Sequence, residues 1–190
     1  QHVSFLFTSL LTDDCIARGK ALLDGGVRYL GGTNETYGNI NTSDSLWVIR
    51  DLVFNQKKYT LRQLNDAMLA NFNGYEALRK DCLNCDKYGN DLETADTMAN
   101  DLYEFVAKGV RNRGIAIGMQ YFLIVISNNQ LNTEWGNRTA ASPDGRLLCM
   151  YMNPANNPQG GANKSGPTAM LNSLAKFDAK YHGGSVQNIK

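Results

Sequence analysis

The fold class is decided by the stretch from Leu92 to Ile126, which reads LETADTMANDLYEFVAKG over residues 92–109 and IAIGMQYFLIVI over residues 115–126. In the first part, apolar residues recur every three or four positions, which predicts an amphipathic helix closed by Gly109. The second part is β-branched and aromatic, which predicts a buried strand. A long helix that leads into an isolated buried strand indicates an α/β architecture.

The residues before this stretch are predicted to be mainly helical. Apolar positions from 10 to 23 have helical spacing. A short strand is expected at Val27–Leu30, followed by a Gly/Asn/Thr loop over 31–42. Ser43 is expected to cap the next helix, and Thr60-Leu-Arg-Gln63 fits a capping box for another. A short helix is predicted from Tyr75 to Cys82.

The carboxyl-terminal part reads as loop, helix and strand. Residues 128–161 are rich in Asn, Gly and Pro and predict a long loop. Pro167 stands where the first turn of a helix favours it, and that helix is expected to reach Asp178. Ser185–Lys190 is predicted to be a strand. The chain therefore divides into a helical shell over 1–110 and a strand and loop region over 111–190.

Size and charge limit the classes of protein. The 190 residues suit one domain, and 43% hydrophobic residues exclude disorder for most of the chain. A formal charge of +1 gives no footprint for nucleic acid or an anionic membrane. The longest apolar run is Tyr121–Ile126, far short of the roughly 18 residues that span a membrane. Because the sequence opens on Gln1 and stops at Lys190 within a predicted strand, we expect it to be part of a larger protein.

Cysteine usage predicts a reducing, cytoplasmic location, because a chain of this size needs no disulfide scaffold. The four cysteines are Cys15, Cys82, Cys85 and Cys149. Four N-x-S/T sequons, at Asn34, Asn41, Asn137 and Asn163, would instead suit a secreted glycoprotein. With 21 asparagines, roughly two sequons arise by chance, so four is a mild excess.

No motif in the chain marks a catalytic or metal centre. Cys82-Leu-Asn-Cys85 falls at the end of a predicted helix, where the helix dipole would raise a thiol pKa, and it lacks further zinc ligands nearby. His182 reads as a solvated turn residue before Gly183-Gly184. The paired glycines fit neither of the phosphate-binding motifs G-x-G-x-x-G and G-x-x-x-x-G-K-[ST], and they read as turns.

Ser142-Pro-Asp-Gly-Arg146 is the one turn that could carry function. Pro-Asp-Gly forces a tight turn and presents Asp144 and Arg146 from a rigid corner. From the residues alone, a structural turn whose Asp bonds its own backbone is the favoured interpretation.

The order of several motifs resembles the glycyl radical enzymes of the pyruvate formate-lyase type. In that family a T-P-D-G-R turn is followed by G-P-T-A-x-x-x-S-x-x-K-x-D, to which residues 142–146 and 166–178 are similar. Earlier stretches also resemble the family in order, at 14–20, 24–26, 44–54 and 87–91. The tail at 184–190 is similar to a family strand of the form G-T-L-x-N-Q-K.

This resemblance implies radical chemistry inside a ten-stranded α/β barrel made of two half-barrels. A glycyl radical, installed by an activating enzyme that uses S-adenosylmethionine, would take hydrogen from a cysteine, and the thiyl radical would activate the substrate. Family members cleave small polar molecules as lyases, dehydratases or formate acetyltransferases. The resemblance also implies a homo-oligomer in the intact enzyme.

Neither radical carrier has a counterpart in this chain. No cysteine stands in the family's C-x-E context, and no glycine stands in R-V-x-G-Y. The expected role is therefore an internal segment between the cysteine loop and the glycyl loop, which forms much of the helical shell and a few strands of the second half-barrel, an incomplete barrel. It is expected to be inactive alone and to bind no cofactor itself, and its partners are the rest of the enzyme and the activating enzyme. The candidate pocket or barrel-mouth residues are Ser142, Asp144, Gly145, Arg146, Gly166, Pro167, Thr168, Asn188 and Lys190.

Two other classes stay open at this point. One is a binding or scaffolding module that kept the shell of the fold and lost the chemistry, which would need its strand edges and apolar faces covered. The other is a secreted, Asn-rich glycan-binding domain, which would carry occupied sequons and oxidised cysteines.

Overall fold

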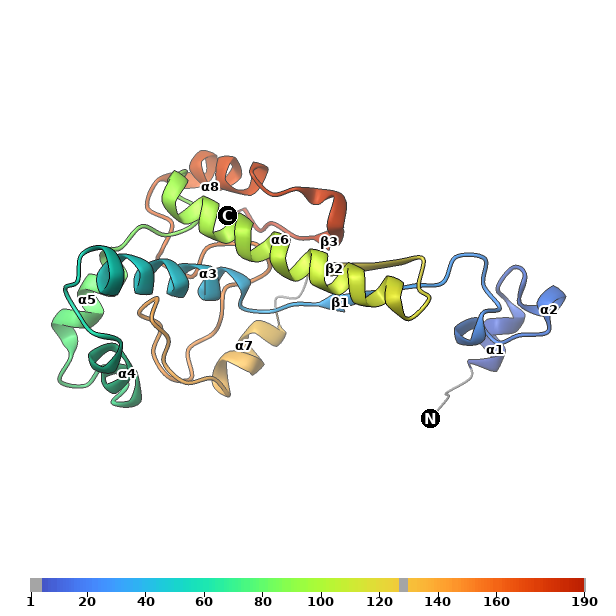
Figure 1. The fold of residues 1–190 in the computed structure, drawn as a ribbon, viewed down its shortest axis with the longest axis horizontal. Helices are drawn as coiled ribbons and strands as arrows, with labels where there is room; N and C mark the ends of the chain where they lie inside the picture. Colours follow the sequence, from blue (N-terminus) through green and yellow to red (C-terminus); the bar gives the residue numbers. More distant parts are fainter. Residues whose placement is uncertain (1–4, 127–129, 190) are drawn as a thin grey trace.

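The computed structural model describes residues 5–126 and 130–189, which form a mixed α/β fold around a parallel sheet (Figure 1). The strands are β1 (Gly31–Glu35), β2 (Tyr121–Ile126) and β3 (His182–Ser185), in the order β1-β2-β3. Both neighbouring pairs are parallel, so each connection must cross over through helices. The α/β class expected from the sequence is confirmed.

The position of β1 differs from the sequence expectation. The strand predicted at Val27–Leu30 is wrong, and pairing with β2 begins instead at Gly31, which lies opposite Tyr121. A Cβ on Gly31 would stand 2.2 Å from the Tyr121 ring, so the glycine lets the aromatic ring lie across the strand. Pairing with a distant strand has therefore overridden the weak β propensity of Gly-Gly-Thr-Asn.

Five helical elements make the crossover from β1 to β2. They are α3 (Asn39–Val48), the π-helical η2 (Ile49–Asn55), α4 (Leu61–Leu69), α5 (Glu76–Asn84) and α6 (Glu93–Ala116). The capping box before α4 is confirmed: Thr60 Oγ1 accepts from Gln63 N at 3.2 Å, and Gln63 Oε1 accepts from Thr60 N at 2.9 Å. The long helix α6 packs on both α3 and β2, as Figure 1 shows.

Two predicted helix ends are wrong. Helix α3 begins at Asn39, after Gly38 with φ 69°, and Ser43 lies inside it with its hydroxyl donating to Ile40 O at 3.0 Å. Helix α6 continues past Gly109 to Ala116, so the first residues of the predicted strand are helical. Its last turn is held against β2, because Gly114 lies directly under the Phe122 ring.

Over residues 130–181, the connection from β2 to β3 contains two helices, α7 (Leu131–Asn137) and α8 (Gly166–Ala175), and the 3-10 turn η3 (Ala179–Tyr181). The sequence predicted α8 with Pro167 in its first turn, which is confirmed, but placed its end at Asp178. Helix α7 was missed inside the predicted loop. The expected strand Ser185–Lys190 is also wrong, because β3 ends at Ser185; Lys190 lies outside the described residues.

The core has two parts. Beneath α3, η2, α4 and α5, one cluster of buried side chains contains Val48, Leu52, Leu64, Ala67, Phe72, Leu78 and Cys82. The other lies between α6, the sheet and α8. There Phe177 stacks on Tyr88 with 5.5 Å between ring centroids and packs at a tilt against Tyr103 with 5.2 Å between centroids. These aromatic contacts fix the chain after α8 against α6, which positions β3.

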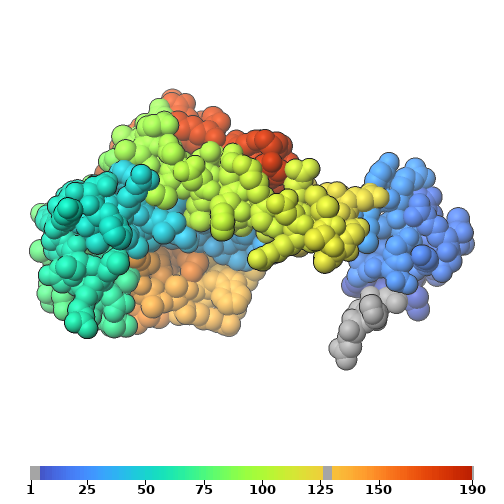
Figure 2. Space-filling view, viewed as in Figure 1, coloured from blue at the N-terminus to red at the C-terminus, as the bar shows by residue number. Residues whose placement is uncertain are grey.

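The amino-terminal pieces stand off from this body, beyond β1 (Figures 1 and 2). They are α1 (Leu6–Leu10), α2 (Cys15–Arg18) and the 3-10 turn η1 (Leu22–Asp24), where one continuous helix was expected. The chain breaks at Asp14 and Gly19, both with positive φ. Several large apolar side chains here are exposed: Phe5, Leu6, Phe7, Leu10, Leu11, Ile16 and Leu23. Within residues 5–126 and 130–189, no helix is long and apolar enough to cross a membrane.

Candidate functional site

The Ser142–Arg146 turn is closed by its own hydrogen bonds. Ser142 N donates to Arg146 O and Gly145 N donates to Ser142 O, both at 3.0 Å, and Gly145 has φ 94°. Asp144 Oδ1 accepts from Ser142 Oγ at 2.5 Å and from Arg146 N at 3.3 Å. The aspartate therefore bonds its own turn, as the structural interpretation of the sequence predicted.

Asp144 also ties the turn to α3. Its Oδ2 accepts from Asn41 Nδ2 at 2.6 Å, and its backbone N donates to Ser45 Oγ at 3.2 Å. Asn41 and Ser45 are buried four positions apart on one face of the helix. The burial of Asn41, together with its side-chain bond to Asp144, leaves that sequon no room for a glycan, which removes one support for the glycan-binding alternative.

Arg146 is committed to main-chain carbonyls. It is 3% exposed, and its guanidinium donates to the carbonyl oxygens of Ala140, Leu147 and Met150 and to Ser142 Oγ. Burial lowers the pKa of the Arg146 guanidinium. With its donors directed at the backbone, Arg146 holds the loop in shape and is not free to clamp an anionic substrate.

Asparagines after this turn connect it to the rest of the fold, a role that sequence reasoning missed. Asn153 N donates to Asn41 Oδ1 at 2.7 Å, and Asn156 Nδ2 donates to Ser185 Oγ at 2.7 Å. Asn157 Nδ2 donates to Asn188 O at 2.7 Å, and Asn188 N donates back to Asn157 Oδ1 at 2.9 Å. The clustering of three asparagines within residues 153–157 was the available signal.

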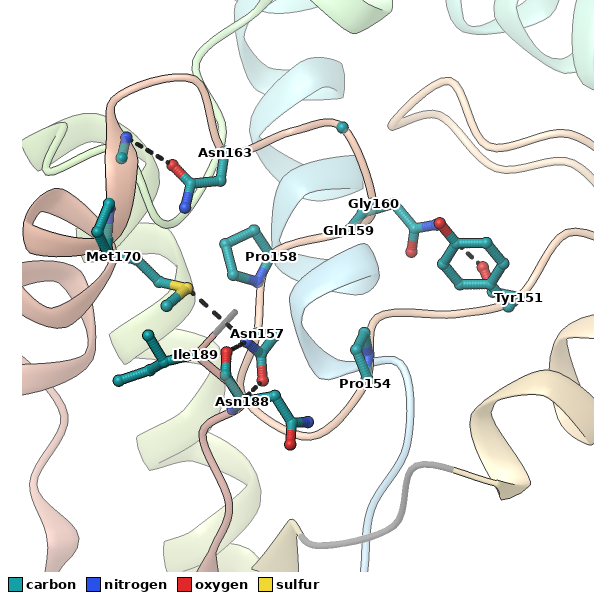
Figure 3. Close-up of a pocket in the computed structure, with 13 residues that line it drawn as sticks. Tyr151, Pro154, Asn157, Pro158, Gln159, Gly160, Asn163, Met170, Asn188 and Ile189 are labelled. Carbon is teal, nitrogen blue, oxygen red and sulfur yellow. Dashed lines mark hydrogen bonds between the residues drawn. The ribbon is translucent and has the colours of Figure 1, made fainter.

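A cavity of about 520 Å³ lies beside the Asn157–Asn188 pair, and we name it the Asn188 cavity (Figure 3). Its wall combines the loop after the Ser142–Arg146 turn, the start of α8 and the chain after β3. The lining residues are Tyr151, Pro154, Asn157, Pro158, Gln159, Gly160, Gly161, Asn163, Gly166, Pro167, Met170, Asn188 and Ile189. Most of this lining is apolar or amide in character, and among the described residues the cavity presents hydrogen-bonding groups without a charged side chain.

The structure separates the sequence-predicted site residues into two groups. Gly166, Pro167 and Asn188 line the Asn188 cavity, whereas Asp144, Gly145 and Arg146 line a second cavity of about 400 Å³. Ser142 acts within its turn and lines neither cavity, and Thr168 is exposed on α8. Asn188 was expected on a barrel strand but lies beyond the end of β3, held there by Asn157.

The two cysteines of the Cys82-Leu-Asn-Cys85 motif are not activated thiols. Burial raises the pKa of Cys82 to about 12 and that of Cys85 to about 11, which leaves both protonated near neutral pH. Cys82 lies in the last turn of α5, as predicted. Among the described residues, no group of His, Cys, Asp or Glu side chains could hold a metal ion.

Comparison with known proteins identifies the family to which this chain belongs. A model of the pyruvate formate lyase-like family matches residues 1–131. The chain belongs to this family. Related sequences include a "4-hydroxyphenylacetate decarboxylase glycyl radical subunit" of Clostridioides difficile, 26% identical over 97% of the chain and 23% of that protein. The family resemblance seen in the motifs is thus confirmed, and its relatives are glycyl radical enzymes.

Several relatives are dehydratases. Trans-4-hydroxy-L-proline dehydratase of Clostridioides difficile is 33% identical over 99% of this chain and 24% of that protein. (2S)-3-sulfopropanediol dehydratase of Klebsiella oxytoca is 32% identical over 97% of the chain and 23% of that protein. A structure described as 1,2-propanediol dehydration in Roseburia inulinivorans superposes with a TM-score of 0.91 and 32% identity, covering 98% and 24% of the two chains. The chain spans about a quarter of the length of these relatives.

Proposed function

We propose that this chain is a segment of a glycyl radical enzyme that dehydrates a small polar substrate, and that it builds part of the active-site mouth. The observation that carries the proposal is the TM-score of 0.91 over 98% of the chain against the Roseburia inulinivorans structure, at 32% identity. The dehydratases at 32–33% identity favour C–O bond cleavage within the broader set of lyases and acetyltransferases.

In this proposal the residues of the segment shape and brace the active site, and none of them reacts with the substrate. The Ser142–Arg146 turn braces the loop that follows it against α3, and Gly166, Pro167 and Asn188 shape the Asn188 cavity. We propose that Thr168 and Lys190 belong to the same mouth, and that the three strands are part of a ten-stranded barrel. In this arrangement residues 1–190 are one partial domain, with a helical shell over 1–110 and a strand and loop region over 111–190.

The stored glycyl radical and the thiyl radical belong to the intact enzyme in this proposal. Its partners are then the remainder of the enzyme, an activating enzyme that uses S-adenosylmethionine, and a second copy of the same chain. A cytoplasmic location is part of the same proposal.

The test is activation of the full-length chain under anaerobic conditions. We expect a glycyl radical signal by electron paramagnetic resonance after incubation with the activating enzyme and S-adenosylmethionine. We then expect loss of water from one member of a panel containing 1,2-propanediol, glycerol, trans-4-hydroxy-L-proline and 2,3-dihydroxypropane-1-sulfonate. A polypeptide of residues 1–190 is the negative control. Absence of a radical from the fully activated chain would contradict the proposal, and a radical with C–C cleavage instead of dehydration would correct its reaction class.

The scaffolding alternative is weakened by one observation. The exposed apolar side chains of α1 and α2 form a surface that a free-standing module would leave in water. In a larger enzyme, other parts of the protein would cover that surface, so the exposed side chains favour the enzyme segment over the free-standing module.

A further inference from the structure

The second cavity, which we name the Lys164 cavity, has a different chemistry from the Asn188 cavity. It measures about 400 Å³ and shares only the Gln159–Gly161 stretch with its neighbour. Its walls come from α3, α5, the Ser142–Arg146 turn and the loop before α8. The enzyme proposal gives this cavity no role.

Cationic side chains outnumber acidic ones in its lining. Five line the cavity: Arg79, Lys80, Lys87, Arg146 and Lys164. Of the residues that the structure describes, two carboxyl groups accompany them, those of Asp44 and Asp144. A concave surface with this excess of positive charge concentrates anions from solution.

Two of the five cations already have protein partners, and the other three keep donors available for a ligand. Arg146 donates to the backbone carbonyls described above. Lys87 is buried, and its Nζ donates to the carbonyl oxygens of Cys82 at 2.5 Å and Cys85 at 3.2 Å. The ammonium groups of Lys80 and Lys164 make no hydrogen bond or ion pair with any residue that the structure describes.

Arg79 also retains donors. Its Nε donates to Gly145 O at 2.9 Å, which orients the guanidinium at the wall of the cavity. Its two terminal nitrogens have no hydrogen-bond partner among the residues described. A guanidinium beside two ammonium groups is a donor set that suits a phosphate group.

Asp44 supplies an independent indication that a ligand belongs here. It is 1% exposed, and its Oδ1 accepts from Tyr88 N at 3.0 Å. Its Oδ2 is equally buried, yet no described residue bonds it. A buried polar atom without a partner is costly, and a hydroxyl group entering the cavity would satisfy it.

We propose that the Lys164 cavity binds a small sugar phosphate, with the phosphate held by Arg79, Lys80 and Lys164 and a ligand hydroxyl bonded to Asp44 Oδ2. The volume lies within the usual range for small-molecule sites. The Lys164 cavity shares only the Gln159–Gly161 stretch with the Asn188 cavity, and its binding of a ligand is tested without activating the enzyme.

The experiment is calorimetric titration of the unactivated full-length chain with ribose 5-phosphate, inorganic phosphate and ribose. We expect ribose 5-phosphate to bind most tightly, inorganic phosphate more weakly, and ribose not at all at this site. Lys80→Ala and Lys164→Ala each weaken ribose 5-phosphate binding by roughly tenfold or more, because each removes a charged donor. Lys108→Ala, an exposed lysine on α6, is the matched control and leaves binding unchanged.

Asp44→Ala tests the hydroxyl contact separately. We expect this variant to bind ribose 5-phosphate no more tightly than inorganic phosphate, and a melting curve checks that it has folded. If Asp44→Ala does not fold, the Lys80 and Lys164 variants still decide whether the Lys164 cavity binds the phosphate group. The proposal is overturned if neither phosphate compound binds, or if the Lys80 and Lys164 variants bind like the Lys108 control. Equal affinity of the unsubstituted chain for both phosphate compounds would overturn the contact to Asp44.

Discussion

Asn41 and Asn153, which are 112 positions apart, form a reciprocal pair: the backbone N–H of each donates to the side-chain Oδ1 of the other, at 3.2 Å and 2.7 Å. Both residues are buried. The pair joins the first turn of α3 to the loop after the Ser142–Arg146 turn, and Asn41 Nδ2 extends the network to Asp144. One helix therefore fixes both the turn and the loop that forms the Asn188 cavity.

Asn153→Ala is expected to lower the stability of the full-length chain by roughly 1–3 kcal/mol. It leaves the buried Asn41 N–H without an acceptor and removes the bond from Asn153 Nδ2 to Ala155 O at 2.8 Å. Chemical denaturation monitored by tryptophan fluorescence measures the loss. Asn73→Ala, on an exposed turn, is the matched control. Equal midpoints for the two variants would show that the pair contributes nothing to stability.

Arg146→Lys is expected to destabilise the chain by roughly 2–4 kcal/mol although the charge is kept. A lysine has no planar fork, so it leaves carbonyl oxygens such as Met150 O without the donors that now reach them. Arg138→Lys is the control, because Arg138 is exposed and pairs with Glu134 on the surface of α7. Thermal melting of both variants gives the comparison, and a small effect at position 146 would contradict the bracing role.

Asp44 should make stability fall as pH rises from about 4 to 7. Burial raises the pKa of Asp44 to about 7, from an ordinary value of 3.8, so the folded chain holds a proton here that the unfolded chain releases. The protonated fold is favoured below the unfolded pKa, and this contribution is lost as pH rises through the folded pKa, with a limiting slope of about 1.4 kcal/mol per pH unit.

Asp44→Asn isolates this effect. The amide keeps an acceptor for Tyr88 N without a titrating proton. The variant's melting temperature, minus that of the unsubstituted chain, should increase between pH 5 and 7 and then stay level. A difference that is flat across this window would show that Asp44 titrates near its ordinary value. The same pair of proteins measured at high salt controls for surface charge.

The features that the sequence predicted are those with local causes. The capping box at Thr60 and the start of α8 at Pro167 depend on bonds and dihedral angles within one turn, so a short window contains the whole cause. The long helix α6 was found for the same reason. Its end was misplaced because Gly109 lies inside the helix. The helix ends instead before Gly118, which has φ 88°, and Met119 N donates back to Gly114 O at 3.0 Å.

The features that the sequence did not predict depend on distant partners. Strand β1 is extended because Tyr121 and its neighbours pair with it. The buried Asn41, Asp44 and Ser45 look like a solvated helix face in the sequence, and only their partners near Tyr88 and in the Ser142–Arg146 turn make that face internal. The separation of the candidate residues into two cavities has the same origin, since each cavity is assembled from segments far apart in the chain.

Two glycine substitutions should act in opposite directions. A Cβ on Gly136, in α7, would stand 2.5 Å from Met150 O and 2.7 Å from Tyr151 Cα, so Gly136→Ala must move the backbone of the cavity loop and costs roughly 1–3 kcal/mol. Gly109, inside α6, has nothing within 4 Å, and Gly109→Ala should stabilise the chain by roughly 0.5–1 kcal/mol. Thermal melting checks both: the melting temperature of Gly136→Ala should lie below that of the unsubstituted chain, and that of Gly109→Ala above it. Two shifts in the same direction would contradict the packing described.

Asn157→Asp tests whether the Asn188 cavity serves the radical reaction. The change is isosteric but removes the donor to Asn188 O and sets a carboxylate against that carbonyl oxygen, so the chain after β3 must shift. In the activated full-length enzyme we expect an unchanged glycyl radical yield and a roughly tenfold or greater fall in kcat/KM, because misplaced substrate contacts affect turnover and not radical storage. Asn65→Asp, exposed on α4, adds the same charge away from the cavity and is expected to match the unsubstituted enzyme. If Asn157→Asp turns over normally, the Asn188 cavity is a packing feature and the mouth of the active site lies elsewhere; if it loses the radical as well, the loop supports storage of the radical instead.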